Sequence, residues 1–441
     1  MSHKQIRPFL MVVALLLVGA VQSVAQSAFS VIEKDRNFAA GSYGVYPERH
    51  LPQLTPAPEG YTPFYISHYG RHGSRYLNDM KAYTNPYQTL LKADSLGKLT
   101  AVGQMALQEM RLNIADAEGR WGDLTGIGKS QQRGIAHRML QNFPEVFGDG
   151  AFVDARSTIV SRCVLSMGTA VLQLVKERPD LKVSMSNSYS NMWYMNHQDR
   201  AIRDSAKTRL ANEAFDAFVD SVWNYDRVTK LLFNDSAYAR QHVDCKWTVY
   251  YLLKASLIQE NNKRSLQPNP LRDIFIDEDF YHFWQMENVW SYINSGFCLL
   301  NNAKIPYLQT YLLRQLIQEA DSVISTQQHG ASLRFGHETV LLPLVCLMGI
   351  NGFDYWTDQL SELESHGWWA STVYPMAGNL QIVFYRKNAA DRQPLIKVLL
   401  NEKEATLPLP SDLAPYYRWS DFRDHYLRTV AEGELVLRSK R

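Results

Sequence analysis

Two arginines flank a histidine in the segment Arg71-His72-Gly73-Ser74-Arg75, which closely follows a short apolar and aromatic run at residues 62–67. Planar guanidinium groups match the oxygens of a phosphoryl group and keep their positive charge. A neutral imidazole nitrogen beside them could attack phosphorus and hold it covalently. The spacing therefore predicts a site that binds and transfers a phosphoryl group. A surface loop with solvated basic residues is the alternative, and the position directly after a buried strand disfavours it.

A phosphoryl-transfer site also needs a proton for the departing oxygen, and His337-Glu338 is the candidate pair. It follows the run 333–336 and precedes the apolar run 339–343, where we expect a strand to end and a helix to begin. There Glu338 could act as a general acid with a pKa raised by partial burial. His337 could hydrogen-bond a phosphate oxygen. From the residues alone, an acid that faces the positive end of the helix dipole explains Glu338 equally well.

A third arginine, Arg162, stands in the segment Ser157-Thr158-x-x-x-Arg162-x-x-x-Ser166, at the end of a strand predicted at 151–157. A helix start offers unpaired N–H groups to an anion, and Arg162 would add a guanidinium. In isolation, a salt-bridged surface arginine is the alternative interpretation.

These segments resemble the markers of the histidine acid phosphatases, the branch of the histidine phosphatase superfamily that includes phytases. Arg71-His72-Gly73-x-Arg75 looks like the family's signature, and Gly336-His337-Glu338-Thr339 falls where the family carries its proton-donor motif. Segments 124–131, 157–166 and 375–381 are similar to further markers. Together the matches run from about residue 61 to residue 387, in the family's order.

The resemblance implies a role for each matching residue. His72 would be the nucleophile that becomes phosphohistidine, and Glu338 would protonate the leaving group. The phosphate pocket would consist of Arg71, Arg75, Arg162 and His337. No metal and no cofactor are implied, because the arginines already supply the positive charge. Water would then hydrolyse the phosphohistidine, with Glu338 returning as base.

The chain departs from the family's pattern at two places. Many members have His-Asp where this chain has His337-Glu338. A glutamate donor is more typical of the multiple inositol polyphosphate phosphatases, which place one residue between the histidine and the glutamate. Leu77 stands where a proline is common, so we expect a less rigid loop. The first departure favours that subgroup, and neither removes a catalytic group.

Three hypotheses about function follow. The leading one is an exported phosphomonoester hydrolase that acts on inositol polyphosphates such as inositol hexakisphosphate (phytate). The second keeps the chemistry but has broad specificity for sugar phosphates or nucleotides. The third is a non-catalytic binder of phosphorylated ligands, which would need neither His72 nor Glu338.

Strands and helices alternate around these segments. Short strands are predicted at 62–67, 151–157, 183–188, 333–335, 380–385 and 395–400, and helical patterns at about 86–115 and through 190–330. We expect an α/β fold with a central, mostly parallel mixed sheet flanked by helices, the histidine phosphatase fold. A mainly α-helical cap domain at 190–330 would be inserted into a phosphatase domain at 26–189 and 331–441. Two similar segments, Leu99-Thr100-x-x-Gly103 and Leu124-Thr125-x-x-Gly128, predict loop-to-helix starts.

Composition limits the partners. The 441 residues are 46% hydrophobic and carry a formal charge of +2, of which Lys4 and Arg7 supply two positive charges. Without them the chain is nearly neutral, and a neutral chain has no global field to hold nucleic acid or an anionic membrane.

Lys4 and Arg7 precede the apolar run 9–21 and the small residues at 23–25, which is typical of a secretory signal peptide cut after Ala25. The run is too short to cross a bilayer. We therefore expect a periplasmic or secreted protein without a stable membrane anchor. Four cysteines permit three pairings in an oxidising compartment. Cys298 and Cys346 lie in apolar runs, which favours buried free thiols.

Overall fold

A computed structural model describes residues 27–48 and 51–438 of the chain. The predicted signal peptide, residues 1–25, lies outside the described residues. The central sheet contains β1 (Thr62–Arg71), β2 (Phe152–Ser157), β3 (Lys182–Ser186), β5 (Gly330–Gly336), β7 (Asn379–Arg386), β8 (Leu395–Leu400), β9 (Lys403–Glu404) and β10 (Tyr416–Arg418). A separate parallel pair consists of β4 (Phe297–Cys298) and β6 (Trp356–Thr357).

The sheet is mixed and runs in the order β10-β8-β7-β1-β5-β2-β3, with β9 paired to β8. The pairs β1–β5, β5–β2 and β2–β3 are parallel, whereas β7 is antiparallel to both β1 and β8. Hence β1, β2, β3, β5 and β8 share one direction, and β7, β9 and β10 run the opposite way. The predicted fold class, a mostly parallel mixed sheet flanked by helices, is confirmed.

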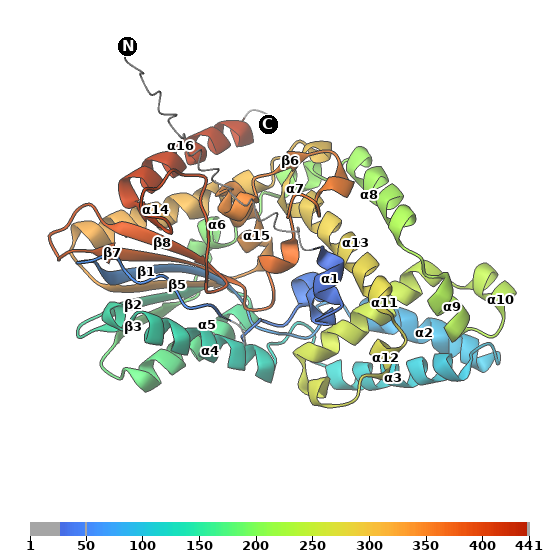
Figure 1. Cartoon of the computed structure of the whole chain (residues 1–441). Coiled ribbons are helices and arrows are strands. Elements are labelled where there is room, and N and C mark those ends of the chain that lie inside the picture. The colour runs from blue at the N-terminus through green and yellow to red at the C-terminus, as the bar shows by residue number, and fades with distance from the viewer. Residues whose placement is uncertain (1–26, 49–50, 439–441) are drawn as a thin grey trace, which may run out of the picture.

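Helices cover both faces of the sheet (Figure 1). On one face, α4 (Gly126–Asn142) and α5 (Ser161–Glu177) share a core with β2 and β5. The other face shares its core with α14 (Thr310–Ser325), α15 (Glu338–Leu347) and α16 (Trp419–Arg438). Strands such as β7 and β8 are buried along nearly their whole length and consist mostly of apolar residues, which made them visible in the sequence.

A second core lies among helices beside the sheet (Figure 1). It joins α2 (Lys81–Ser95), α3 (Ala101–Ala117), α9 (Asp226–Leu232), α11 (Cys245–Ile258) and α13 (Asp277–Ser295). Shorter helices complete the chain: α1 (Ala28–Ile32), α6 (Met192–Met195), α7 (Arg200–Ser205), α8 (Arg209–Val222), α10 (Ser236–His242) and α12 (Pro270–Asp273). Helices from before and from within residues 190–330 thus pack together, while α14 lies on the sheet. The division into a phosphatase domain and an inserted cap stays a prediction.

The two similar segments both start helices, as predicted. The hydroxyls of Thr100 and Thr125 accept hydrogen bonds from the backbone N–H of Gly103 and Gly128, which caps α3 and α4. The helical stretch expected at about 86–115 is two helices rather than one, because Gly97 adopts a φ of 64° after α2 ends.

All four cysteines are free thiols, and Cys163, Cys298 and Cys346 are buried. This confirms the interpretation of Cys298 and Cys346. None of the helices in residues 27–48 and 51–438 has the length and apolar character needed to cross a membrane.

Candidate active site

Three parallel strands end side by side at one edge of the sheet. Arg71 at the end of β1 is in register with Gly336 at the end of β5, and Ser157 at the end of β2 is in register with Phe335. The ladder continues past the strands, since the backbone N–H of His72 donates to the carbonyl of Gly336 at 3.0 Å. Open α/β sheets bind ligands outside the carboxyl ends of their strands. The register therefore brings the predicted site residues to such an edge.

His72 is fully buried, and its tautomer follows from one contact. Its Nδ1 lies 2.9 Å from the carbonyl oxygen of Gly73, which can only accept, so Nδ1 carries the proton. The Nε2 lone pair is then free, and among the described residues Nε2 has no hydrogen-bond partner. Burial, together with the nearby guanidinium of Arg71, lowers the pKa of His72 well below 6.5. His72 is therefore a neutral imidazole with an open nucleophilic nitrogen.

The loop that carries His72 is clamped against the start of α4. A Cβ on Gly73 would lie 2.4 Å from the carbonyl oxygen of Gly128, and a Cβ on Gly128 would lie 2.3 Å from the carbonyl oxygen of Ser74. Only two glycines allow this close approach. The backbone N–H of Ser74 also donates to Oε1 of Gln131 at 2.8 Å, and that of Gly73 donates to Oγ of Ser166 at 3.1 Å. These positions belong to the marker segments quoted above, which thus fix the loop.

Arg71 is fully buried and directs two of its nitrogens to protein groups. Nη1 donates to the carbonyl oxygens of Ser42 at 2.5 Å and Tyr374 at 2.7 Å, and Nε donates to Oε2 of Glu338 at 3.0 Å. Nη2 is buried and has no partner among the described residues. Because Ser42 and Tyr374 act through backbone carbonyls, which every residue has, no sequence pattern could identify them.

Arg75 and Arg162 add two more guanidiniums. Arg75 is 3% exposed and donates from Nη1 to the carbonyl of Tyr76 at 2.9 Å. Arg162 lies in the first turn of α5, and burial, followed by the nearby charge of Arg75, lowers its pKa. In each residue, Nε is buried and without a partner in the described part of the chain. Buried donors are normally satisfied, so these unpartnered groups around His72 fit the oxygens of an anion.

His337 and Glu338 lie at the junction of β5 and α15, as predicted. Nε2 of His337 is 3.1 Å from Oγ1 of Thr158, and burial lowers the pKa of His337 to about 4. Oε2 of Glu338 is 3.8 Å from Nε2 of His72. The structure thus brings together all six residues selected from the sequence.

The expected pKa of Glu338 was wrong. Burial, the largest single effect, raises this pKa, but the effects of Arg71, His72, Arg75 and His337 together outweigh burial, so the pKa lies well below 4.5. Glu338 is therefore ionised when the site contains no anion. Its ion pair with Arg71 explains the difference, and that contact exists only in the folded chain.

Among the described residues, His72, His337 and Glu338 each offer a ligand atom within 4.8 Å of the others, close enough to share a metal ion. Arg71, whose guanidinium contacts Glu338 and lowers the pKa of His72, gives the group a positive field that disfavours a cation. The positive charge beside these three side chains therefore favours an anion over a metal ion.

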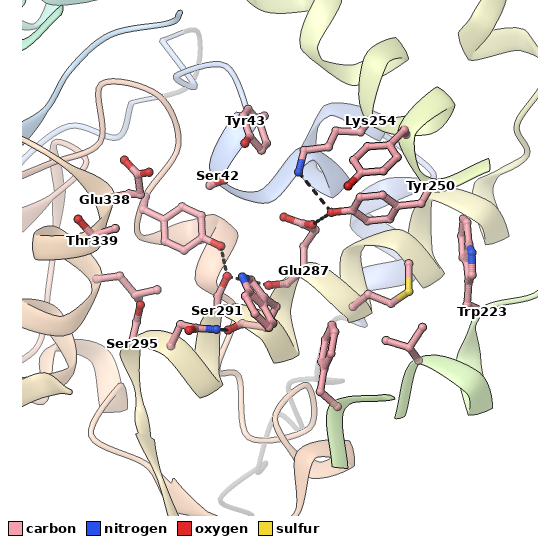
Figure 2. A pocket seen from close by; sticks show the side chains of 18 of the residues that line it. Ser42, Tyr43, Trp223, Tyr250, Lys254, Glu287, Ser291, Ser295, Glu338 and Thr339 are labelled. Carbon is pink, nitrogen blue, oxygen red and sulfur yellow. Dashed lines mark hydrogen bonds between the residues drawn. The ribbon is translucent and has the colours of Figure 1, made fainter. Parts of the chain in front are cut away.

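A cavity of about 420 Å³ adjoins Glu338. Figure 2 shows Glu338 and Thr339 on one side of it, Trp223 on the opposite side, and Lys254, Tyr250 and Glu287 joined by hydrogen bonds between them. The cavity is lined by residues of the segment 42–43, of α8, α11, α13 and α15, and by Tyr374. Of the six site residues selected from the sequence, Glu338 lines this cavity, and it is also the candidate proton donor to the alcohol part of a phosphate ester.

An α/β sheet whose strand ends present a neutral imidazole among guanidiniums defines a phosphatase of the histidine type. The chain belongs to the histidine phosphatase superfamily (branch 2), whose family model matches residues 70–401. It is accordingly a histidine acid phosphatase.

Solved structures share the fold. The multiple inositol polyphosphate phosphatase of Bifidobacterium longum, in complex with inositol hexasulfate, is similar over 89% of this chain and 97% of its own, with a TM-score of 0.73 and 17% identity. The phytase from D. castellii is similar over 94% of this chain and 90% of its own, with a TM-score of 0.67 and 16% identity. No curated protein matches the chain by sequence.

Proposed function

We propose that the chain hydrolyses phosphomonoesters through a phosphohistidine on His72. The observation that carries the proposal is the buried, unpartnered Nε2 of His72, held in its neutral form beside guanidinium nitrogens that also lack partners. The free N–H groups of Arg71, Arg75 and Arg162 would bind the phosphate oxygens, together with His337. Fixed donors of this kind stabilise the charge of a transferring phosphoryl group.

In the first step, Nε2 of His72 attacks phosphorus and the bond from phosphorus to the alcohol oxygen breaks. The departing oxygen takes a proton from Glu338. The ring of His72 becomes positively charged, and the carbonyl of Gly73 stabilises it through the Nδ1–H hydrogen bond. In the second step, Glu338 takes a proton from water, the water oxygen attacks phosphorus, and the P–N bond breaks. Inorganic phosphate leaves and both side chains return to their starting states.

Because Glu338 is ionised before an anion binds, its proton must arrive with the substrate. A phosphate dianion would offset the charge of Arg71 and Arg75 and so raise the pKa of Glu338. Alternatively the substrate binds as a monoanion, since the second pKa of a phosphate monoester is about 6. In both routes the bound complex contains one proton more than the free enzyme and the free substrate dianion contain together.

Two substrate classes remain candidates. Inositol polyphosphates, the leading prediction, are supported by the fold likeness to an inositol polyphosphate phosphatase solved with inositol hexasulfate. Unspecialised phosphomonoesters such as nucleotides are supported by the composition of the cavity, which contains only two lysines. We also propose that the protein is exported, on the basis of the predicted signal peptide.

The first test is phosphate release from inositol hexakisphosphate and from an aryl phosphate at pH 5 and pH 7, with a chelator present throughout. We expect metal-independent release by the unchanged enzyme and none by the His72→Ala variant. Turnover of the aryl phosphate alone would support the proposed chemistry and would contradict inositol polyphosphates as the substrate class. Failure with both substrates would favour a non-catalytic binder of phosphorylated ligands.

A further inference from the structure

We infer that the cavity beside Glu338 selects phosphomonoesters whose alcohol part carries a flat aromatic ring, with a nucleoside monophosphate as the model substrate. The inference rests on the proposed phosphatase function. It concerns the leaving-group side of the site, which the phosphate-binding residues do not determine.

Aromatic side chains dominate the walls of this cavity. They are Tyr43, Phe215, Trp223, Trp247, Tyr250, Tyr251, Trp290 and Tyr374. Trp247 and Trp290 are 40% and 48% exposed, so their indole rings are accessible to a ligand in the cavity. Trp290 packs against Phe215 with ring centroids 5.2 Å apart, and Trp247 against Tyr250 at 5.1 Å. These contacts orient the rings and reduce the entropy lost when a flat ligand stacks on them.

The charged side chains that line the cavity carry no net charge, and both lysines among them contact a neighbouring side chain. Its lining includes two lysines and two glutamates. Nζ of Lys246 lies 2.6 Å from a carboxylate oxygen of Asp220. Lys254 donates to the hydroxyl of Tyr250 at 3.2 Å, and that hydroxyl donates to the carboxylate of Glu287. A hexakisphosphate would place further phosphates near the carboxylates of Glu287 and Glu338, with two lysines in the lining to offset them.

The same polar groups suit the edge of a heterocyclic base. The chain from Lys254 through Tyr250 to Glu287 crosses the cavity (Figure 2), and it offers both a donor and an acceptor. Ser291 and Asn294 on α13 also line the cavity. A volume of about 420 Å³ lies within the range of small-molecule sites, which is about 300–1,000 Å³. Stacking walls with a few polar groups are what a nucleobase requires.

The test compares adenosine 5′-monophosphate with ribose 5-phosphate. Both esters release a primary alcohol of the same sugar, so the chemical step is matched and only the base differs. We expect kcat/KM to be about tenfold or more higher for the nucleotide, the usual effect of stacking one base. The Trp290→Ala variant should lose this preference, because its kcat/KM should fall much more for the nucleotide than for ribose 5-phosphate. Trp356→Ala is the matched control, since Trp356 is 46% exposed and stacks on Phe297 outside the cavity.

Each other outcome has a defined meaning. Equal kcat/KM for the two esters, or a preference that survives Trp290→Ala and Trp247→Ala, would overturn the inference. Faster turnover of inositol hexakisphosphate than of the nucleotide would also overturn it, while leaving the phosphatase function intact. No turnover of any ester by a folded enzyme would instead contradict the proposed function itself.

Discussion

Arg71 connects the proton donor Glu338 to the position proposed for the phosphate group. Its Nε and Nη1 hold Glu338 and the carbonyls of Ser42 and Tyr374, while Nη2 stays free for a phosphate oxygen. One planar group thus fixes the proton donor, two loops and the anion relative to each other.

Replacing Arg71 by lysine should therefore abolish most activity although the charge is kept. A single ammonium group cannot donate hydrogen bonds to Glu338, to the two carbonyls and to a phosphate oxygen at once. Each charge-assisted hydrogen bond that is lost costs about 1.5–3 kcal/mol. We expect kcat/KM to fall by about 100-fold or more, with weaker inhibition by inorganic phosphate. Steady-state kinetics with a phosphate titration measures both. Near-full activity of the variant would exclude Arg71 from the phosphate pocket.

Glu338 supports a second prediction, on protons. Its pKa lies well below 4.5 in the free enzyme, and a bound phosphate dianion should raise it. At pH 7 we expect binding of inorganic phosphate to take up additional protons from the buffer. Calorimetry in two buffers of different ionisation enthalpy measures this number. The Glu338→Gln variant is the control and should show smaller uptake; equal uptake by the two proteins would contradict the role of Glu338.

The pH dependence of catalysis follows from the same groups. Burial keeps His72 neutral well below pH 6.5, so its protonation does not limit activity at mildly acidic pH. The proton for the leaving group becomes scarce above the second pKa of the substrate phosphate, about 6. We expect kcat/KM to be highest at acidic pH and to fall as the pH rises above about 6. A maximum above about pH 9 would remove Glu338 from its role as proton donor.

At the scale of elements, the contact between the His72 loop and α4 is the critical fit. A methyl group on Gly128 would lie 2.3 Å from the Ser74 carbonyl, so Gly128→Ala must push the loop away from the helix. A displacement of about 1 Å at a reacting group costs about 100-fold in rate, and we expect a loss of that order in kcat. Circular dichroism and steady-state kinetics together separate this loss from unfolding.

Gly126→Ala is the matched control for that prediction. Gly126 lies in the first turn of the same helix, and a Cβ there would meet nothing within 4 Å. Alanine is the better helix former by about 1 kcal/mol in a helix interior. The control should keep full activity and a thermal midpoint that is unchanged or higher. Equal effects of the two substitutions would show that the close contact is unimportant.

The sequence was most informative where a pattern is local. Strand β8 was predicted with its observed ends, and β1, β2, β5 and β7 to within a few residues, because short apolar stretches mark strands that are largely buried. The six proposed site residues could be selected from the sequence because they lie at or shortly after those strand ends. The segment Arg71-His72-Gly73-Ser74-Arg75 also matches the signature of the histidine acid phosphatases.

Features that depend on distant contacts were not predictable in the same way. The low pKa of Glu338 arises from Arg71, which is 267 positions away in the chain. Ser42 and Tyr374 hold Arg71 through their carbonyls, which every residue type has. The break between α2 and α3 had a local signal in Gly97, but the surrounding helical periodicity masked it.

For the whole molecule, buried neutral histidines link stability to pH. Burial lowers the pKa of His68 to about 3 and that of His337 to about 4, against an unfolded value of 6.5. Below pH 6.5 the unfolded chain binds protons that the folded chain does not, so the free energy of unfolding falls as the pH falls. Between pH 6.5 and 5 each histidine should cost about 2 kcal/mol.

Urea unfolding at pH 7 and pH 5 tests this prediction. We expect a lower midpoint at pH 5, and a smaller difference between the two pH values in the His68→Phe variant, whose ring can pack on Phe335 as that of His68 does. An unchanged or higher midpoint at pH 5 would show that these histidines become protonated in the folded chain.

The order in which the site is completed has a consequence during protein synthesis. The backbone around His72 depends on late segments: the N–H of His72 donates to Gly336, that of Arg71 donates to Gly378, and the carbonyl of His72 accepts from Ala377. These partners are synthesised more than 260 residues after His72. Until then the nucleophile has no pocket, so the nascent chain is catalytically silent.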